Sequence, residues 1–522
     1  MFVLGLVSLA SGVLGGKLAS EASAGFAANL RQDAYDKIQT FSFANIDRFS
    51  TSSLITRLTT DITSVQMSFQ MSIRMLVRAP VMFVFASVMA FIIEPQIAWI
   101  FLVAAAILFV FVLLIMNAAQ PSFRQMFKKY DRLNAVAQEN LTGIRVVKSY
   151  VLEGPEIEKY QKATQEVYDY SVRAEKLMAA MSPVVQVIMY TTMIILLTVG
   201  GVSIVRRDLG IADLTGLLSY ATQILSGVMM VAMVLTFIAM SRPAMERISE
   251  ILSEESTIEA PADPVFEVKD GSIEFDHVSF AYRKGGEGED VIKDVSLKIA
   301  SGETIGIIGQ TGSAKTTLVS LIPRLYDATE GSVKVGGRDV KEYDLTALRD
   351  AVAMVLQKNV LFSGSVAENL RWGKEDATQE ELEFACKQAC ADEFIEQLPG
   401  KYEYDLGQGG VNVSGGQKQR LCIARALLKS PKVLILDDST SAVDTKTDSR
   451  IRAALREHAP EVTKLIIAQR INSVQDADRI LVLDEGRVSG FGTHEELLKS
   501  NEIYRSIYES QTRGGDDHAD AE

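Results

Sequence analysis

Long uncharged stretches in the first half of the chain predict helices that cross a membrane. Residues 1–16, 177–205 and 214–241 carry no charge, and residues 79–120 hold a single charge, at Glu94. A helix needs about 20 apolar residues to cross a bilayer. Uncharged runs of this length are rare in the buried helices of soluble proteins, which is the alternative interpretation. The pattern therefore predicts crossings near residues 1–20, 77–93, 97–118, 183–205 and 214–240.

Lysine and arginine residues predict which loops face the cytoplasm. Segments 17–78 and 119–176 hold seven and ten of them, so both segments are expected inside, together with everything after residue 242. The turns at 94–96 and 206–213 are expected outside, although Arg206 and Arg207 run against this rule. Since 16 helical residues span only about 24 Å, less than the roughly 30 Å of a hydrocarbon core, we expect one further transmembrane helix before them. A cleaved signal peptide is the alternative.

The cytoplasmic stretches, such as 122–176, have a heptad-like pattern and predict helices that continue beyond the membrane. Segments 43–49 and 150–156 interrupt this pattern. They are interpreted either as short elbows that dock onto the soluble part or as exposed turns.

A change in composition predicts a second, soluble domain. The run Ala-Pro-Ala-Asp-Pro at 260–264 is typical of a linker. Strand-like runs follow it, and from Ile305 helical segments alternate with strands, which predicts a parallel α/β sheet. The predicted organisation is a helical membrane domain at 1–255, a linker at 256–267, an α/β domain at 268–510 and a disordered polar tail at 511–522.

Composition excludes several classes of protein. Hydrophobic residues make up 48% of the chain, too many for a disordered protein, and charged residues make up 23%, too many for membrane helices alone. The net charge of −13 gives no basic footprint, so nucleic acid is not expected as a partner. Three cysteines exclude a disulfide scaffold. Cys386 and Cys390 are expected to be core residues, because a metal site would need further ligands.

The strand at 304–308 leads into a phosphate-binding loop and then a helix. In such a loop the backbone N–H groups hold phosphates, Lys315 reaches the β- and γ-phosphate oxygens, and Thr316 ligates Mg²⁺. A second apolar strand ends in Asp437, which fits the Mg²⁺-binding aspartate of such proteins, although any buried strand with a polar end looks similar. The predicted ATP-binding loop comprises Gly309, Gln310, Thr311, Gly312, Ser313, Ala314, Lys315, Thr316 and Thr317.

A third motif, Val-Ser-Gly-Gly-Gln at 413–417, resembles the signature of ATP-binding cassette (ABC) proteins, and the resemblance covers nearly the whole chain. It implies that Tyr282 stacks on adenine, that Gln357 binds ATP and Mg²⁺, and that segment 407–410 takes part in coupling. It also implies that segments 43–49 and 150–156 are coupling helices, with Glu153 at a common acidic position, and that residues 1–20 form the second of six helices. The implied signature residues are Ser414, Gly415, Gly416 and Gln417, and the implied D-loop residues are Ser441, Ala442, Val443 and Asp444.

Three residues depart from the family pattern where the chemistry takes place. Ala314 replaces a glycine, which costs about 1 kcal/mol or more if φ must be positive. Asp438 replaces the catalytic glutamate, and its carboxylate recedes by roughly an ångström, which can cost about 10²-fold in rate. Gln469 replaces the switch histidine and cannot carry a proton charge. Together these departures predict a site that binds ATP and Mg²⁺ and hydrolyses ATP slowly.

In this family each ATP site combines the phosphate loop of one chain with the signature of another. The intact signature and the altered catalytic residues, Asp438 and Gln469, would therefore serve different sites. The resemblance implies the degenerate-site half of a heterodimeric exporter, whose partner is a second half-transporter that supplies glutamate and histidine. The expected cargo is a hydrophobic drug, lipid or peptide, moved across the cytoplasmic (plasma) membrane.

Several alternatives remain open at this point. A homodimeric exporter with slow ATPase and a regulatory subunit that gates without pumping both fit the sequence. Soluble ABC ATPases are excluded by the membrane segments, and importers usually carry their membrane subunits on separate chains. Arg420 and Gln417 either stabilise the interface between two chains or serve as a surface charge and a helix cap. The methionine-rich last crossing fits either a promiscuous pocket or ordinary packing, and its methionines are Met229, Met230, Met233 and Met240.

Overall fold

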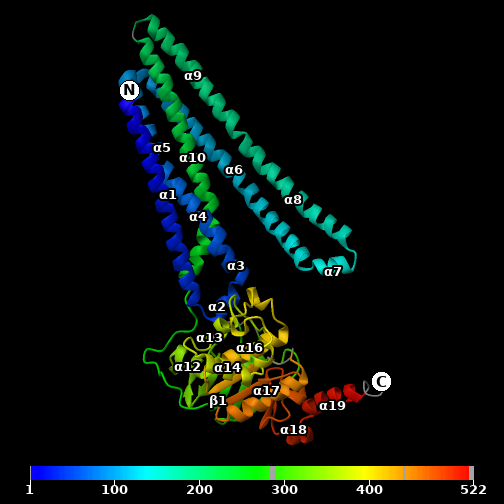
Figure 1. Ribbon diagram of the computed structural model, residues 1–522. Helices are drawn as coiled ribbons and strands as arrows, with labels where there is room; N and C mark the ends of the chain where they lie inside the picture. The colour runs from blue at the N-terminus through cyan, green and yellow to red at the C-terminus, as the bar shows by residue number, and fades with distance from the viewer. Residues whose placement is uncertain (1, 208, 283–288, 439–442, 517–522) are drawn as a thin grey trace. The chain divides into compact units, whose positions relative to one another are not determined.

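The computed structural model describes residues 2–207, 209–282, 289–438 and 443–516, the last five by their backbone alone (Figure 1). The chain forms two compact units. We call Met1–Thr40 with Ser50–Glu254 the helical unit, and Phe41–Phe49 with Glu255–Glu522 the α/β unit.

The described residues of the helical unit contain five stretches long and apolar enough to span a bilayer, which confirms the predicted crossings. They are Phe2–Gln39, Thr51–Ile93, Pro95–Thr142, Glu153–Val205 and Ile211–Ser253. The helices are α1 (Phe2–Gln39), α3 (Thr51–Thr56), the π-helix η1 (Arg57–Asp61), α4 (Ile62–Leu76), α5 (Arg78–Ile93), α6 (Pro95–Thr142), α7 (Ile144–Ser149), α8 (Glu153–Ala179), α9 (Met181–Val205) and α10 (Ile211–Ser253).

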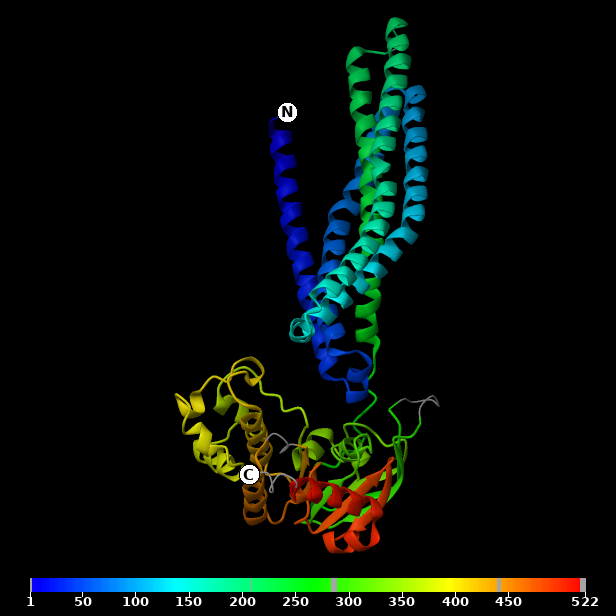
Figure 2. The same cartoon turned by 90° about the vertical axis from the view of Figure 1, so that its right-hand side faces the viewer.

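Small residues let the membrane helices pack closely. Ala86 and Ala90 of α5 are fully buried in one apolar cluster with Leu108 of α6 and Leu217 of α10. By contrast, only 6% of the apolar window of α1 is buried. Figure 2 shows the N-terminal part of this helix standing apart from the rest of the helical unit. Its apolar surface is therefore available to lipid or to another helix.

Helices α6 and α8 form the long arm that the heptad-like pattern predicts, with α7 at its tip (Figure 1). Lys129 Nζ donates to Glu166 Oε2 at 2.8 Å across the arm. The interruption predicted at 150–156 is present at residues 150–152, between α7 and α8, but the coupling helix expected there is displaced. The short helix precedes this interruption, at Ile144–Ser149, and α8 already begins at Glu153. Gly143 ends α6 earlier than the hydrophobic pattern indicated, and Val151, at φ +55°, makes the turn.

The described residues of the α/β unit form two sheets. An antiparallel sheet has the order β2-β1-β4-β5, and a mostly parallel sheet has the order β10-β9-β3-β8-β7-β6 with β10 antiparallel at its edge. The predicted parallel sheet is confirmed. The strands are β1 (Ile273–Phe280), β2 (Ile292–Ile299), β3 (Thr304–Ile308), β4 (Glu330–Val335), β5 (Arg338–Asp339), β6 (Val352–Val355), β7 (Val433–Asp437), β8 (Thr463–Ile467), β9 (Arg479–Asp484) and β10 (Arg487–Gly492).

Helices surround these sheets and complete two apolar cores. Cys386 and Cys390 are buried in one of them, as predicted. Helix α19 continues to Asp516, past the start of the predicted tail at residue 511. The helices are α2 (Phe43–Arg48), α11 (Lys315–Ser320), α12 (Leu345–Ala351), α13 (Val366–Arg371), α14 (Gln379–Gln388), α15 (Asp392–Ile395), α16 (Gly415–Leu428), α17 (Thr445–His458), α18 (His494–Ser500) and α19 (Glu502–Asp516).

The strand order positions the candidate site. Strands β3, β8 and β7 are neighbours and parallel, so their carboxyl ends meet at one edge of the sheet. The phosphate loop follows β3, and Gln469 follows β8. Asp437 is the last residue of β7, and Asp438 comes directly after it. Residues from three distant segments of the chain are brought together, as is usual for ligand sites of open α/β sheets.

Candidate functional site

The phosphate loop curls around the ammonium group of Lys315. Lys315 Nζ donates to the carbonyl oxygens of Gly309 and Gln310, both at 2.8 Å, and lies 3.3 Å from Ser313 Oγ. Burial lowers the pKa of Lys315, and the carboxylates of Asp437 and Asp438 oppose this shift. The positively charged ammonium group of Lys315 is thus held at the N-terminus of α11, next to the backbone N–H groups of the loop.

Two positions of the loop require unusual backbone geometry. A Cβ atom on Gly309 would lie 2.2 Å from Leu483 O, so no side chain fits there. Ala314 has φ +71° and ψ 22°, in the left-handed region, directly before α11. Residue 314 therefore has the positive φ at which alanine was predicted to be unfavourable. An L-residue in this region loses roughly 1–2 kcal/mol.

Thr316 and Asp437 present oxygen atoms beside the loop. Thr316 Oγ1 donates to Asp437 Oδ1 at 3.0 Å. Asp437 is 2% exposed, and among the described residues its Oδ2 has no hydrogen-bond partner. Burial raises the pKa of Asp437 and the charge of Asp438 raises it further, while Thr316 and Lys315 lower it. A buried, unpartnered carboxylate oxygen next to a hydroxyl suits a hard cation such as Mg²⁺.

Asp438 and Gln469, the two predicted catalytic residues, touch each other. Gln469 Nε2 donates to Asp438 Oδ2 at 2.8 Å, and Asp438 itself has a positive φ of 47°. Burial raises the pKa of Asp438, and the Gln469 hydrogen bond, Lys315, Arg470 and the Gln357 side chain each lower it. The two departures therefore form one interacting pair, which the sequence alone did not indicate.

Gln511 fixes the backbone of the predicted switch. Its Nε2 donates to Gln469 O at 2.8 Å, and its Oε1 accepts a hydrogen bond from Ile471 N at 2.9 Å. Gln511 was predicted to begin a disordered tail, and this contact was not predicted. The polar composition around it carries no signal that would have revealed a contact 42 residues away.

Tyr282 and Gln357 lie at the same site as the loop. The Tyr282 hydroxyl is 2.8 Å from Thr317 Oγ1, on the helix that follows the phosphate loop, and about half of Tyr282 is exposed. Gln357 follows β6 and is exposed, and its side chain lowers the pKa of Asp438. Both predicted residues are therefore placed where they could contact a nucleotide.

The signature segment begins helix α16. Ser414 and Gln417 form a capping box, in which Gln417 Oε1 accepts from Ser414 N at 2.8 Å. Ser414 and Gly415 are exposed and Gly416 is partly exposed, so the N-terminus of a 14-residue helix faces outward. Within this chain Gln417 is a helix cap, and Arg420 donates to Cys390 O at 2.7 Å rather than lying free.

The described part of the predicted D-loop starts helix α17. Ser441 and Ala442 lie outside the described residues, Val443 is buried, and Asp444 accepts a hydrogen bond from Thr447 N at 2.9 Å as the helix cap.

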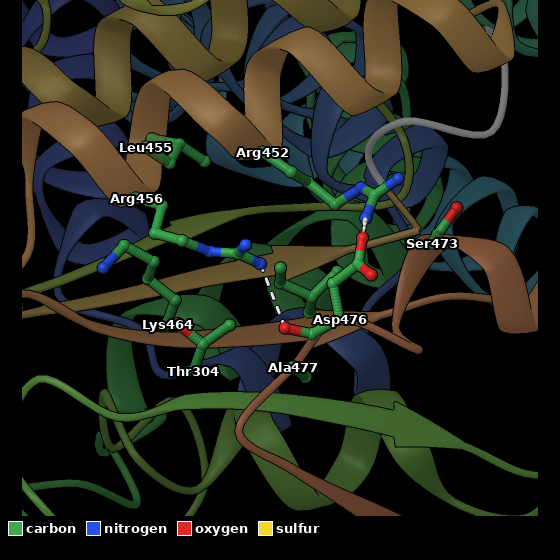
Figure 3. A pocket seen from close by; sticks show the side chains of 9 residues that line it. Thr304, Arg452, Leu455, Arg456, Lys464, Ser473, Asp476 and Ala477 are labelled. Atoms are coloured by element: carbon green, nitrogen blue, oxygen red, sulfur yellow. Dashed lines mark hydrogen bonds and ion pairs between the residues drawn. The ribbon is translucent and has the colours of Figure 1, made fainter. Parts of the chain in front are cut away.

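A buried polar cluster, missed by the sequence analysis, ties α17 to the segment behind the switch. Asp448 Oδ2 accepts from Ser473 Oγ at 3.0 Å and from Arg452 Nε at 3.2 Å. Arg452 also donates to Asp476 Oδ2 at 3.0 Å (Figure 3). The side chains in Figure 3 surround a cavity of about 10 Å³, the size of one water molecule. These bonds fix the position of α17 relative to residues 473–476, which follow the predicted switch residue Gln469.

Comparison with known proteins identifies the family. Residues 1–229 match the ABC transporter transmembrane region, and residues 292–441 match the ABC transporter family of ATP-binding domains. The chain is 36% identical to the ABC transporter ATP-binding protein YfiB of Bacillus subtilis, over 98% of this chain and 88% of YfiB. It is 32% identical to the "Probable multidrug resistance ABC transporter ATP-binding/permease protein YheI" of the same organism, over 81% of this chain and 72% of YheI.

A solved structure, described as a bacterial Atm1-family ABC exporter with ATP bound, has the same fold. It matches 97% of this chain and 88% of its own chain, with a TM-score of 0.84 and 25% sequence identity. The chain therefore belongs to the ABC transporter family as an exporter-type half-transporter, a multi-pass membrane protein with a cytoplasmic nucleotide-binding domain.

Proposed function

We propose that this chain is the degenerate-site half of a heterodimeric ABC exporter. The observation that carries the proposal is the hydrogen-bonded pair of Asp438 and Gln469, which stands where the family has glutamate and histidine. A carboxylate one methylene shorter cannot reach an attacking water from the same backbone position, and a displacement of about 1 Å can cost roughly 10²-fold in rate. Gln469 donates its amide N–H to that carboxylate and cannot exchange a proton at neutral pH.

ATP is proposed to bind at this site with its phosphates on the loop. The backbone N–H groups of residues 309–314 and the Lys315 ammonium hold the phosphate oxygens, and Tyr282 stacks on the adenine. Thr316, Asp437 and Gln357 would hold Mg²⁺, and this assignment is supported by Asp437 Oδ2, which has no hydrogen-bond partner among the described residues. When bound, Mg²⁺ would supply positive charge that offsets the negative charge of the phosphates. Binding of ATP therefore does not depend on the altered pair.

The intact signature is proposed to complete the partner's site. Ser414, Gly415 and Gly416 lie at an exposed helix N-terminus, which suits the phosphates of an ATP held by a second chain. The second half-transporter supplies the catalytic glutamate and the switch histidine for that site. The described residues Tyr150 and Val151 are 72% and 79% exposed, and apolar residues this exposed at a helix tip fit contact with another chain.

The proposed cargo is a hydrophobic drug, lipid or peptide. Two relatives from Bacillus subtilis, YheI and YgaD, carry multidrug resistance or multidrug export in their names. Met233 and Met240 of α10 are 50% and 56% exposed in this chain. Exposed methionines adapt to ligands of varied shape.

An asymmetric pair of substitutions tests the proposal in the complex purified from its native membranes through a tag on this chain. Gly415→Asp places a negative charge in the signature and is expected to abolish ATP turnover, since it damages the partner's active site. Lys315→Ala damages only the degenerate site and is expected to leave more than half of the turnover. Equal loss with both substitutions would show that the two sites are equivalent, as in a homodimer, and would refute the proposal.

A further inference from the structure

A short helix from the membrane half of the sequence is built into the α/β unit. Helix α2 lies between α1 and α3 in the chain, yet it belongs to the compact unit that holds the phosphate loop. Ser42 caps it, and Ser42 Oγ is 2.7 Å from Thr257 Oγ1. Asn45 Nδ2 donates to Glu255 O at 3.0 Å. These bonds fix the orientation of α2 within the unit.

Tyr326 contacts α2 through both its hydroxyl group and its ring. The Tyr326 hydroxyl donates to Asp47 Oδ2 at 2.6 Å. The ring centroids of Phe43 and Tyr326 are 6.0 Å apart, in an edge-to-face arrangement. Burial and the Asp47 hydrogen bond both raise the pKa of Tyr326, so its phenol remains a neutral donor under physiological conditions.

The same ring also contacts the residue predicted to stack on adenine. Tyr326 and Tyr282 have ring centroids 5.4 Å apart at an interplanar angle of 87°, and Phe280 completes the aromatic cluster at 5.5 Å from Tyr326. The Tyr282 hydroxyl in turn reaches Thr317 on the helix of the phosphate loop. One chain of contacts therefore runs from the adenine position, through Tyr326, to α2.

The loop that presents Tyr326 is firmly held. Arg324 is 5% exposed and pairs with Asp327, with Nε and Oδ1 2.8 Å apart. Arg349 Nη2 donates to Arg324 O at 3.0 Å. These contacts anchor the loop on both sides of Tyr326 and fix the position of its ring and hydroxyl group.

We propose that Tyr326 is a positioning residue that reports occupancy of the adenine subsite to α2, so that the exporter responds to the base of ATP as well as to its phosphates. The inference rests on the proposed function, because the stacking role of Tyr282 is part of it. Adenine stacked on Tyr282 restricts the ring, the edge-to-face contact restricts Tyr326, and the hydroxyl–carboxylate bond restricts α2. Contiguous packed side chains of this kind can carry coupling between sites.

Amide hydrogen exchange in α2, residues Phe43–Arg48, tests the proposal in the whole 522-residue chain in lipid nanodiscs. The probes are Mg²⁺ with ATP and Mg²⁺ with inorganic tripolyphosphate, which has no base. In the unchanged protein, saturating ATP is expected to slow exchange in α2 about fivefold or more, and tripolyphosphate less than twofold. Equal protection by both probes would overturn the proposal, because the phosphates alone would then control α2.

The substitution Tyr326→Phe keeps the ring and removes only the hydroxyl. It is expected to abolish the protection of α2 by ATP while changing the ATP dissociation constant less than threefold. The matched control is Tyr343→Phe, which removes a buried hydroxyl that donates to Val335 O at 2.8 Å in the same unit. This control is expected to retain the protection. Undiminished protection in Tyr326→Phe would refute the proposal.

Two further substitutions separate the possible causes of failure. Asp47→Ala removes the acceptor on α2 and is expected to reproduce the effect of Tyr326→Phe, which keeps the test available if either variant folds poorly. Tyr282→Ala is expected to weaken ATP binding at least tenfold and tripolyphosphate binding less than threefold, the latter through loss of its hydrogen bond with Thr317. Unchanged ATP binding in Tyr282→Ala would count against the adenine subsite itself. If the unchanged protein binds ATP but amide exchange in α2 does not slow, the result counts against the role of Tyr326 alone.

Discussion

Replacing Ala314 with glycine is expected to stabilise the α/β unit slightly, although glycine usually destabilises a folded protein. Ala314 has φ +71°, where an L-residue loses roughly 1–2 kcal/mol relative to its preferred conformations. Glycine avoids that strain. Ala314→Gly therefore restores the residue that the backbone of the phosphate loop favours.

Two smaller effects act in the opposite direction. Glycine gives the unfolded chain more conformational freedom, which lowers stability by about 0.4–1 kcal/mol. The Ala314 methyl group is half-buried against the apolar core, and its loss removes about half of the roughly 0.8 kcal/mol that a fully buried carbon contributes. Relief of strain exceeds these two effects by about 0.5 kcal/mol, which corresponds to a rise in Tm of about 1–2 °C for a domain of this size.

Ala351→Gly is the matched control, because Ala351 packs against the same core but ends the ordinary helix α12. At the ordinary backbone angles of Ala351, glycine brings the unfolded-state cost of about 0.4–1 kcal/mol without any relief of strain, so the two substitutions are expected to have opposite signs. Unfolding of the full chain can be followed by the fluorescence of Trp372 after Trp99→Phe leaves it as the single tryptophan. If Ala314→Gly lowers stability as much as Ala351→Gly does, the left-handed backbone at residue 314 is not a source of strain and the reasoning fails.

Three further predictions concern the surroundings of this loop. Gln469→Ala removes a hydrogen bond that lowers the pKa of Asp438, so the pKa of Asp438 should rise. The acidic limb of the pH–rate profile of residual ATPase should then move to higher pH, and an unmoved limb would contradict this. Gln511→Ala should speed amide exchange just after Gln469 by about tenfold, the equivalent of roughly 1.4 kcal/mol, with no change at distant amides. Arg452→Met leaves the buried carboxylate of Asp448 without its cation and should lower the free energy of unfolding by about 3 kcal/mol. Chemical denaturation measures this loss, and a loss below about 1 kcal/mol would show that the ion pair is unimportant.

The parts of the fold that depend on local pattern could be predicted from the sequence. Uncharged runs gave the membrane crossings, because each crossing needs its own apolar length whatever surrounds it. The loop at 309–317 lies between a strand and a helix, as its glycines and lysine predict. The interruption predicted at 150–156 is present at residues 150–152, but the short helix at Ile144–Ser149 was not predicted, because hydrophobic periodicity did not indicate that α6 ends at Gly143.

The contacts that join distant segments could not be predicted in this way. Asp438 and Gln469 meet because β7 and β8 are parallel neighbours in one register, and the sequence of either strand does not specify that register. Gln511 reaches the switch from a helix whose composition resembles a disordered tail. The hydrogen bond between Tyr326 and Asp47 links positions 279 residues apart. Such pairs depend on the tertiary arrangement, so they appear only once the fold is known.

ATP turnover by the purified chain, without any partner, tests the central claim most directly. The degenerate-site account predicts turnover near zero for the unchanged chain and a rise of about tenfold or more when Asp438→Glu and Gln469→His are combined, because the pair then regains its reach and its proton carrier. Adding Lys315→Ala to that double variant should abolish the gain, which assigns it to this site. Turnover of a few per second or faster by the unchanged chain, a rate typical of enzymes, would contradict the account and favour a homodimeric exporter in which Asp438 is a working catalyst.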